Sequence, residues 1–186
     1  MKLRKKIQAY KIIINNMTAK QISIEKAKKD KLFYFVANVV VYRDSDKKCL
    51  ILKRSDREIA HPGRYGVIGG KLEWGDMPVE NPDHINGDIL DYNDMIERLL
   101  VREAMEEAGI EIFSEIRYIN SKTFIRPDEV PVVLVKFTAK YKSGDIVLED
   151  GAFTDYAWVD EVEVKNYECI DGIAEEVALS VKAWQK

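Results

Sequence analysis

The sequence predicts one α/β or α+β sandwich, in which β-strands pack against two substantial helices. The chain has 186 residues, of which 46% are apolar and 33% charged, as expected for one globular domain with a hydrophobic core. Short runs rich in aromatic and β-branched residues are separated by turn-forming residues, and these runs indicate strands. Two longer segments, 94–108 and 170–185, carry apolar residues at helical spacing instead.

The chain begins with a segment of different composition. Residues 1–30 are rich in lysine and weakly patterned, and residues 18–31 could form a helix opened by Thr18. We expect an appended, solvated segment there rather than a nucleic-acid-binding arm. After it, "LFYFVANVVVY" from Leu32 predicts a buried strand, "RDSDKK" a turn, and "CLILKR" the returning antiparallel strand.

The middle of the chain combines loops with the first helix. Residues 61–76, "HPGRYGVIGGKLEWGD", are rich in glycine and proline and predict irregular backbone with a short apolar centre. Residues 77–92 are polar and turn-prone, so we expect a loop insertion. The helix at 94–108 should end at Gly109, because glycine readily adopts the left-handed conformation that terminates helices.

The last third of the sequence predicts three strands and the second helix. The strands are expected at 113–125, 131–141 and 155–160. The C-terminal helix is amphipathic, with one apolar face formed by Ile173, Val177, Val181 and Trp184.

Three acids gather at the end of the first helix. Glu103, Glu106 and Glu107 share one face, because residues three and four apart are neighbours on a helix. Like charges at this spacing repel, and the C-terminal end of a helix dipole disfavours carboxylates further. A bound cation would resolve this conflict, and all-oxygen ligands suit magnesium. The alternative is a solvated helix end in which Arg102 supplies the counter-charge.

The apolar stripe of the same helix decides where these acids point. The stripe runs toward Glu103 and Glu107, and its members are Ile96, Leu99 and Leu100. We therefore expect these two carboxylates to face the protein rather than bulk water.

Two segments around this helix carry a recognisable pattern. "GKLEWGD", from Gly70 to Asp76, and "REAMEEAGI", from Arg102 to Ile110, resemble the two halves of the signature box of the Nudix hydrolases. The chain departs from the pattern in having Asp76 where glutamate is usual. It also has 25 residues between Asp76 and Arg102 where the box has seven. The resemblance covers roughly residues 32–185.

The resemblance implies a fold, a reaction and a metal site. The implied fold is an α/β/α sandwich with a mixed sheet, and the implied reaction is hydrolysis of a diphosphate bond in a nucleoside diphosphate derivative. It also implies Mg²⁺, with Mn²⁺ as a substitute, held by Glu103, Glu106, Glu107 and the carbonyl of Gly70. Arg102 would orient these carboxylates or form an ordinary helix salt bridge.

Further residues are candidates for contacts with such a substrate. Phosphates are expected to meet Arg64, Lys71 and Arg126, whereas the aromatic residues Phe33, Tyr34 and Tyr118 stack on a base or belong to the core. Glu73 contacts metal or braces its turn, and bracing is preferred. The general base is one of the helix glutamates or an acid of two loops, which contribute Asp128, Glu129, Glu149 and Asp150.

Domain organisation and partners follow from the same reading. We expect an N-terminal extension at 1–30 and a Nudix hydrolase domain at 31–186, with 77–92 inserted in the box. The net charge of −3 and the lack of a long apolar run predict a small-molecule nucleotide-type substrate, with no nucleic-acid or membrane partner. Two distant cysteines and no leader pattern predict a cytoplasmic protein, and a homodimer is possible. The alternatives are a catalytically inactive Nudix-fold module that binds nucleotides or regulates, and an unrelated domain with an acidic helix.

Overall fold

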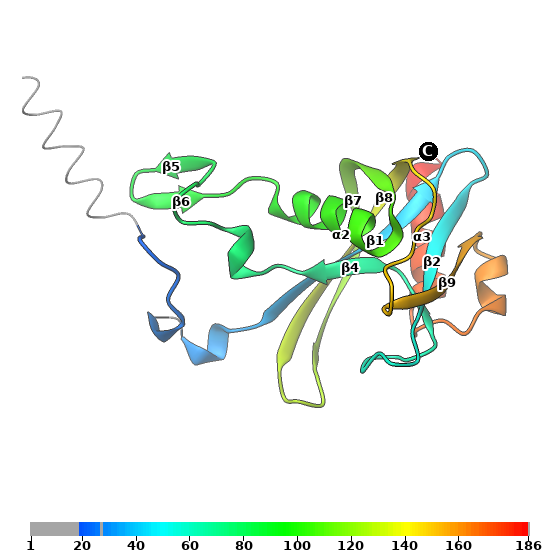
Figure 1. The fold of residues 1–186 in the computed structure, drawn as a ribbon, viewed down its shortest axis with the longest axis horizontal. Helices are drawn as coiled ribbons and strands as arrows, with labels where there is room; N and C mark the ends of the chain where they lie inside the picture. The colour runs from blue at the N-terminus through cyan, green and yellow to red at the C-terminus, as the bar shows by residue number, and fades with distance from the viewer. Residues whose placement is uncertain (1–18, 27, 186) are drawn as a thin grey trace, which may run out of the picture. The chain divides into compact units, whose positions relative to one another are not determined.

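The computed structural model describes residues 19–26 and 28–185, which fall into two compact units. One unit consists of residues up to Leu32 together with Glu73–Met95. The other consists of Phe33–Leu72 together with Ile96–Lys186 and contains both helices of the predicted sandwich (Figure 1).

The second unit is built on a mixed sheet. Its strands are β1 (Tyr34–Arg43), β2 (Lys48–Arg54), β3 (Tyr65–Gly66), β4 (Ile68–Lys71), β7 (Glu111–Ile125), β8 (Pro131–Ser143) and β9 (Phe153–Val159). The strand order is β3-β2-β1-β8-β7, with β4 also paired to β1 and β9 to β2. Strands β1 and β8 run parallel, and the other pairs are antiparallel.

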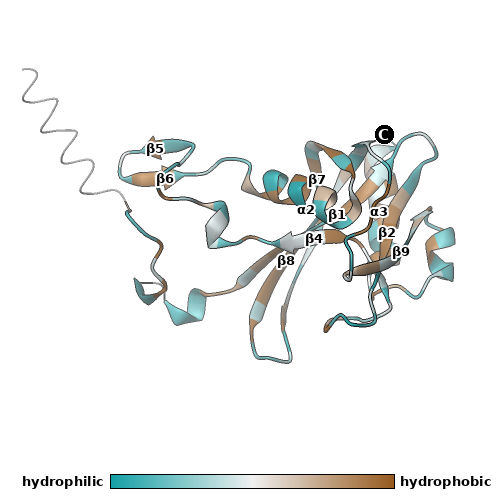
Figure 2. Cartoon of the chain, in the orientation of Figure 1, coloured by the Kyte–Doolittle hydropathy of each residue, from teal (hydrophilic) through white to brown (hydrophobic). Residues whose placement is uncertain are grey.

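Two helices cover opposite faces of this sheet. Helix α2 (Met95–Ala108) packs its apolar stripe against alternate residues of β1, including Ala37, Val39 and Val41. Helix α3 (Ile173–Trp184) packs against the other set, including Val40 and Tyr42. Both faces of β1 are therefore buried, which explains its continuous run of hydrophobic residues (Figure 2). The α/β/α sandwich predicted from the sequence is confirmed.

Helix α2 ends as its sequence predicts. Gly109 has φ +67°, and its N–H donates to the carbonyl of Met105, while the N–H of Ile110 reaches back to Ala104. The bond from Gly109 to Met105 is that of an αL cap, which requires a left-handed residue at this position. The motif turns the chain directly into β7 and fixes where the last turn of α2, with Glu106 and Glu107, lies.

The first unit contains only short elements in its described part. The three-residue 3₁₀ turns η1 (Ile24–Lys26) and η2 (Lys29–Lys31) stand where a longer helix was considered, and Thr18 lies outside the described residues. A further 3₁₀ turn, η3, spans Trp74–Asp76. The expected loop at 77–92 contains a hairpin of β5 (His84–Asn86) and β6 (Ile89–Asp91). Gly87, with φ +66°, permits the two-residue turn between these strands.

Three further observations complete the description of the fold. The 3₁₀ helix η4 (Glu163–Asn166) connects β9 to the segment that leads into α3. None of the helices that the structure describes is long and apolar enough to cross a bilayer. Cys49 is buried, Cys169 is half-buried, and both are free thiols.

Candidate active site

Helix α2 presents two of its three clustered acids to strand β4. Leu99, Leu100 and Ala104 are buried under the helix, and this anchors the face that carries the acids. Glu103 lies on that face with its side chain only 14% exposed. Glu107, one turn further, accepts a hydrogen bond from the backbone N–H of Gly69 at 3.1 Å. The expectation that these two carboxylates point into the protein is confirmed.

The glycines of β4 make this close approach possible. Gly70 pairs with Ala37 of β1, on the face that α2 covers. A Cβ on Gly70 would overlap the carboxylate of Glu103. Only a residue without a side chain lets an acid lie directly against the strand backbone at this position.

The electrostatics of Glu107 are unusual. Burial raises its pKa to about 8, and the negative charges of Glu103 and Glu149 raise it as well. The hydrogen bond from Gly69 and the charge of Arg54 act in the opposite direction but do not cancel the burial. In the absence of a cation, Glu107 therefore holds a proton at neutral pH.

Glu149 reaches this site from the loop before β9. Its backbone N–H donates to the carbonyl of Glu107 at 3.1 Å, which ties the loop to the end of α2. Glu149 and the adjacent Asp150 are both exposed. Glu149 and Asp150 were among the candidates for the general base that the sequence offered. The structure brings Glu149 close to Glu107.

Glu106 and Arg102 lie on a more exposed part of the helix. The Glu106 side chain is 53% exposed and forms an ion pair with Arg102 at 3.3 Å. Arg102 also pairs with Glu103 at 3.3 Å, so it links the exposed and the buried acid. Across residues 19–26 and 28–185, no three acidic, histidine or cysteine side chains are already arranged to hold a metal ion. The structure thus brings Glu103 and Glu107 together beside β4, with Glu106 at their edge.

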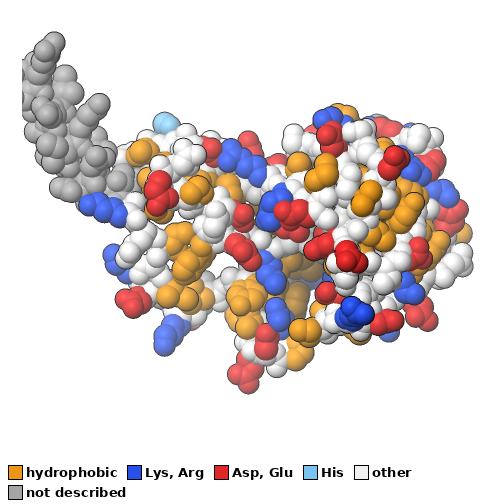
Figure 3. Space-filling model, viewed as in Figure 1, with side chains coloured by type: hydrophobic (Ala, Val, Ile, Leu, Met, Phe, Trp, Pro, Cys, Tyr) orange, Lys and Arg blue, Asp and Glu red, His pale blue; other side chains and the backbone are white. Residues whose placement is uncertain are grey.

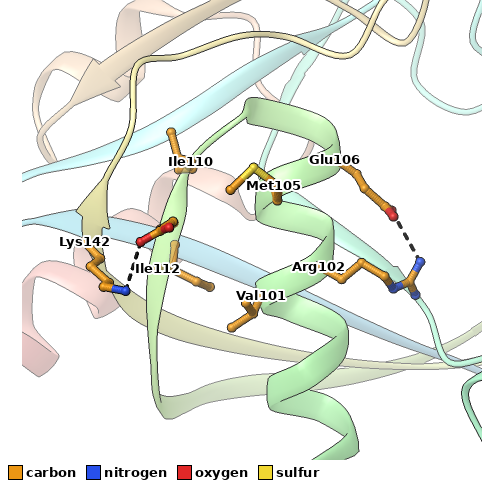
Figure 4. Close-up of a pocket in the computed structure, with 8 residues that line it drawn as sticks. Val101, Arg102, Met105, Glu106, Ile110, Ile112 and Lys142 are labelled. Carbon is orange, nitrogen blue, oxygen red and sulfur yellow. Dashed lines mark hydrogen bonds and ion pairs between the residues drawn. The ribbon is translucent and has the colours of Figure 1, made fainter.

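A pocket of roughly 440 Å³ opens beside this exposed edge (Figure 4). Met105 and Ile112 contribute to its apolar lining, while Arg102 and Glu106 lie at one side. Lys142 forms an ion pair at 2.9 Å with Glu111, which also lines the pocket. Glu103 and Glu107 do not line it, so this pocket is separate from the acids at β4.

The three predicted phosphate-binding residues are distributed over the second unit. Lys71 ends β4 and is exposed, one residue after Gly70. Arg126 follows β7, pairs with Asp128 at 2.9 Å and lies over the ring of Tyr34 at 5.8 Å. Arg64 donates to the backbone carbonyl of Cys169 at 3.3 Å. Lys71 is therefore the one that adjoins Gly70, the residue packed against the Glu103 carboxylate.

The candidate aromatic residues are exposed rather than part of the core. Phe33, Tyr34 and Tyr118 are 50%, 47% and 63% exposed. Tyr34 faces the side of the sheet opposite to α2, because side chains alternate along β1 and Tyr34 shares the parity of Val40 and Tyr42, which pack against α3. Phe124 of β7 is paired with the same Val132 and is 44% exposed. Tyr34 and Phe124 thus flank one apolar residue on the surface of the sheet.

The acids of the first half of the motif brace a turn within the first unit. Glu73 and Asp76 form a reciprocal capping box around η3, and the N–H of Glu73 donates to Asp76 at 2.9 Å. This geometry supports the bracing role preferred for Glu73. It gives Asp76, the atypical residue of the motif, the same role.

Two contributors to the site were not identified from the sequence. Gly69 supplies the N–H that Glu107 accepts, and Arg54 supplies a nearby positive charge. Gly69 belongs to the glycine-rich segment at 61–76, but its hydrogen bond to Glu107 depends on how α2 packs on β4. Arg54 ends the second strand, and nothing in its local sequence points to a helix fifty residues away.

The donor set at β4 fits a hard divalent cation. Glu103 and Glu107 offer carboxylate oxygens, and the absence of a Cβ on Gly70 leaves its backbone accessible to the same space. A cation would also stabilise the ionised form of Glu107, which burial disfavours. The oxygen-only chemistry matches magnesium or manganese better than zinc.

Comparison with solved structures identifies the fold. The MutT protein of Methanosarcina mazei Go1 matches with a TM-score of 0.57 and 17% identity over 86% of this chain and 100% of its own. A MutT NUDIX hydrolase from Burkholderia pseudomallei matches with a TM-score of 0.58 and 20% identity, over 80% of this chain and 99% of its own. The NUDIX domain of Shewanella oneidensis NrtR, solved with ADP ribose, matches with a TM-score of 0.61 and 14% identity, over 86% of this chain and 95% of its own.

These likenesses define the class of fold. A scan of protein-family models found no match to the sequence, and a search of curated proteins found none. The solved structures nevertheless agree with the motif in the sequence, and the chain has the fold of the Nudix hydrolases.

Proposed function

We propose that this protein is a magnesium-dependent pyrophosphohydrolase that cleaves a diphosphate bond in a nucleoside diphosphate derivative. The observation that carries the proposal is the position of Glu103 and Glu107, which lie against the glycines of β4. Both residues belong to the half of the motif that matches the Nudix box completely. The fold supports the same assignment.

The metal would be held by Glu103, Glu106 and Glu107 together with the carbonyl of Gly70. When bound, Mg²⁺ neutralises the diphosphate and acidifies and orients the attacking water. Glu106 takes part after a change of side-chain rotamer that releases it from Arg102, because it lies only one turn from the buried acids. Arg102 remains paired with Glu103 and holds that carboxylate in place.

The chain's own residues supply proton transfer. We assign the role of general base to Glu149, because its charge reaches Glu107 and its own side chain is exposed to water. The backbone hydrogen bond between Glu149 and Glu107 keeps this loop beside the helix. Asp128 and Glu129 lie in the β7–β8 turn, where Asp128 is engaged by Arg126, and are not assigned this role.

The position of the acids limits which candidate residues can meet the substrate. Tyr34 and Phe124 are exposed on either side of Val132, and Arg126 lies over Tyr34, but these rings lie on the face of the sheet opposite to α2 and its acids. We therefore assign no base-stacking role to them. Lys71 would contact phosphate, because it is exposed and next to Gly70.

The test is a hydrolysis assay over several substrates. ADP-ribose, nucleotide sugars, dinucleoside polyphosphates and nucleoside triphosphates would be incubated with Mg²⁺, with Mn²⁺ and with a chelator. We expect phosphate-containing products from at least one diphosphate substrate only when the metal is present. Glu107→Gln should abolish this release while circular dichroism stays unchanged, and Glu106→Gln should do the same. Near-normal turnover in both variants would contradict the assignment.

A second candidate function is a Nudix-fold module that binds nucleotides without cleaving them. It is favoured by the exposed, ion-paired position of Glu106, which leaves no ready three-acid group within the described ranges. Isothermal titration with ADP-ribose separates the two candidates. Binding without turnover under any metal condition supports the module, whereas binding with turnover supports the enzyme.

The remaining expectations complete the proposal. Residues 1–30 act as an extension of a Nudix hydrolase domain at 31–186, and residues 77–92 are an insertion in its motif. The protein acts in the cytoplasm on a small molecule, without a nucleic-acid or membrane partner. A homodimer is compatible with this role, and analytical ultracentrifugation would establish the oligomeric state.

A further inference from the structure

Two segments of this chain carry strong and opposite charges. Residues 1–31 contain ten lysines and arginines but only two acids. Residues 73–95 contain seven acids and no lysine or arginine. The overall net charge of −3 conceals this separation, and residues 143–164 of the second unit, with seven acids and no lysine or arginine, are a second acidic segment of similar length.

The fold groups parts of these two segments into one compact unit. Ala19–Leu32 and Glu73–Met95 are clustered together, although about forty residues separate them in the chain. The basic residues at 19–31 thus belong to the same unit as the acidic insertion. Residues 1–18 lie outside the described part and carry five further basic residues, with no acid among them.

This unit has no hydrophobic core in its described part. None of its described residues is buried, whereas the second unit has two buried clusters. Ile85 and Ile89 of the β5–β6 hairpin are 49% and 59% exposed, and hydrophobic side chains lie at the surface over this hairpin (Figure 3). An isolated two-stranded hairpin is only marginally stable in water, so a further segment is needed to cover it.

We propose that residues 1–18 of the same chain bind the acidic insertion at the β5–β6 hairpin. Lys2, Arg4, Lys5, Lys6 and Lys11 supply the charge that the insertion lacks, and the run Ile12–Ile14 supplies apolar surface. Glu80, Asp88 and Asp91 supply acidic side chains on and beside the hairpin.

Chain continuity favours binding within one molecule. Residue 19 belongs to the unit that contains the insertion, so the chain itself joins the proposed occupant to the unit that it would bind. A short tether gives an effective concentration in the millimolar range, far above that of a second molecule in dilute solution. Attraction between the segments acts over about 10 Å at 0.1 M salt and weakens as salt is raised.

Zero-length carbodiimide cross-linking of the full chain, followed by mass spectrometry, tests the proposal. The reagent joins lysine amines directly to carboxylates. We expect cross-links from Lys2, Lys5, Lys6 or Lys11 to Glu80, Asp88 or Asp91, at about tenfold higher yield than to exposed control acids. The control acids, Asp145, Glu161 and Glu168, lie in the second unit. Similar yields for both sets, or no cross-links to the insertion, would overturn the proposal.

An isotope-mixing experiment and a charge-reversal experiment accompany the cross-linking. In a mixture of ¹⁴N- and ¹⁵N-labelled protein, the cross-linked peptides should carry a single isotope. Mixed-isotope pairs would show binding between molecules and overturn the proposed occupant. Replacing Lys2, Arg4, Lys5, Lys6 and Lys11 by glutamate should abolish the cross-links. Adding Glu80→Lys, Asp88→Lys and Asp91→Lys to that variant should restore them, with the carboxylates now in the N-terminal segment and the amines in the insertion. The N-terminal variant changes only residues outside the described ranges, and an unchanged circular dichroism spectrum would show that loss of its cross-links does not arise from unfolding.

Discussion

Glu107 holds a position that conflicts with its own charge. It is buried, it faces Glu103, and it sits in the last turn of a helix, where the dipole disfavours anions. A fold that served only stability would place an apolar residue or glutamine there. A buried carboxylate at this position destabilises the fold, and a bound cation in the functional state would offset that unfavourable free energy.

The pH dependence of stability tests this state of Glu107. Its pKa is about 8 in the folded chain and 4.5 for an ordinary glutamate. Between these values the folded state keeps a proton that the unfolded state releases, so Glu107 makes the free energy of unfolding fall as pH rises. In the presence of a chelator, we predict that thermal stability declines from pH 5 to 8 and that Glu107→Gln flattens this decline.

Glu111→Gln is the matched control for that measurement. Glu111 is exposed, and Lys142 and Ser143 hold its pKa below the usual value, so its contribution has the opposite sign and a lower pH range. The prediction fails if the thermal stability of Glu107→Gln falls with pH as steeply as that of the unmodified chain. It also fails if Glu107→Gln is less stable than the unmodified chain at pH 8.

Gly70 is required by packing rather than by an unusual backbone angle. Its φ is not positive, but a Cβ would overlap the Glu103 carboxylate. We predict that Gly70→Ala displaces Glu103, weakens Mg²⁺ binding and lowers stability by about 1–3 kcal/mol. Gly75→Ala is the control, because nothing lies within 4 Å of the added atom. Calorimetric titration and thermal melts would measure both effects, and equal behaviour of the two variants would contradict the prediction.

At the scale of elements, α3 is held to the sheet partly by a buried ion pair. Lys136 of β8 bonds to Oε1 of Glu176, and their side chains are only 6% and 1% exposed. Oε2 of Glu176 has no hydrogen-bond partner within the described structure, and burial raises the Glu176 pKa. Removing one member of such a pair leaves a buried charge alone, which is more costly than removing both.

Removing Lys136 alone should therefore lower the free energy of unfolding more than removing Lys136 and Glu176 together. We predict that Lys136→Met lowers the free energy of unfolding by about 3–5 kcal/mol, while Lys136→Met with Glu176→Leu recovers most of the loss. Lys142→Met breaks the exposed Lys142–Glu111 pair and should cost at most about 1 kcal/mol. Urea denaturation at neutral pH measures all three, and a double variant no more stable than the single one would argue against this account.

The end of α2 offers a second test at this scale. Gly109 and Gly151 both have positive φ, but only Gly109 has close neighbours, with Val147 about 3.0 Å from an added Cβ. Alanine at either position should cost about 1–2 kcal/mol for the left-handed backbone. Gly109→Ala should cost more and should also weaken the αL cap of α2. Equal losses in chemical denaturation would indicate that the contact with Val147 is unimportant.

At the scale of the molecule, the sandwich could be predicted because its elements have strong local patterns. The hydrophobic run of β1, the stripe of α2 and the apolar face of α3 each contain the signal for their own burial. The small strands β3 and β4 were not distinguished from irregular backbone, because two and four residues give too little periodicity. The β5–β6 hairpin was expected to be a loop, because its strands of three residues each are also too short to show a periodic pattern.

The site was only partly predictable from the sequence. The orientation of Glu103 and Glu107 followed from the stripe of α2, since a helix fixes the direction of every side chain along it. The exposure of Glu106 did not follow, because it depends on the ion pair with Arg102 and on the angle at which α2 crosses the sheet. The approach of Arg54 and Gly69 required the tertiary structure, because these contacts join distant parts of the chain.

The acids of α2 are proposed to hold a divalent cation against β4, and a titration with Mg²⁺ measures this binding. Isothermal titration would compare the unmodified chain with Glu103→Gln, Glu107→Gln and the exposed control Glu111→Gln. We predict a saturable Mg²⁺ site in the unmodified chain and in the control, with about a tenfold or greater loss of affinity in each α2 variant. Equal Mg²⁺ affinity in all four proteins, or no saturable binding in any of them, would contradict it.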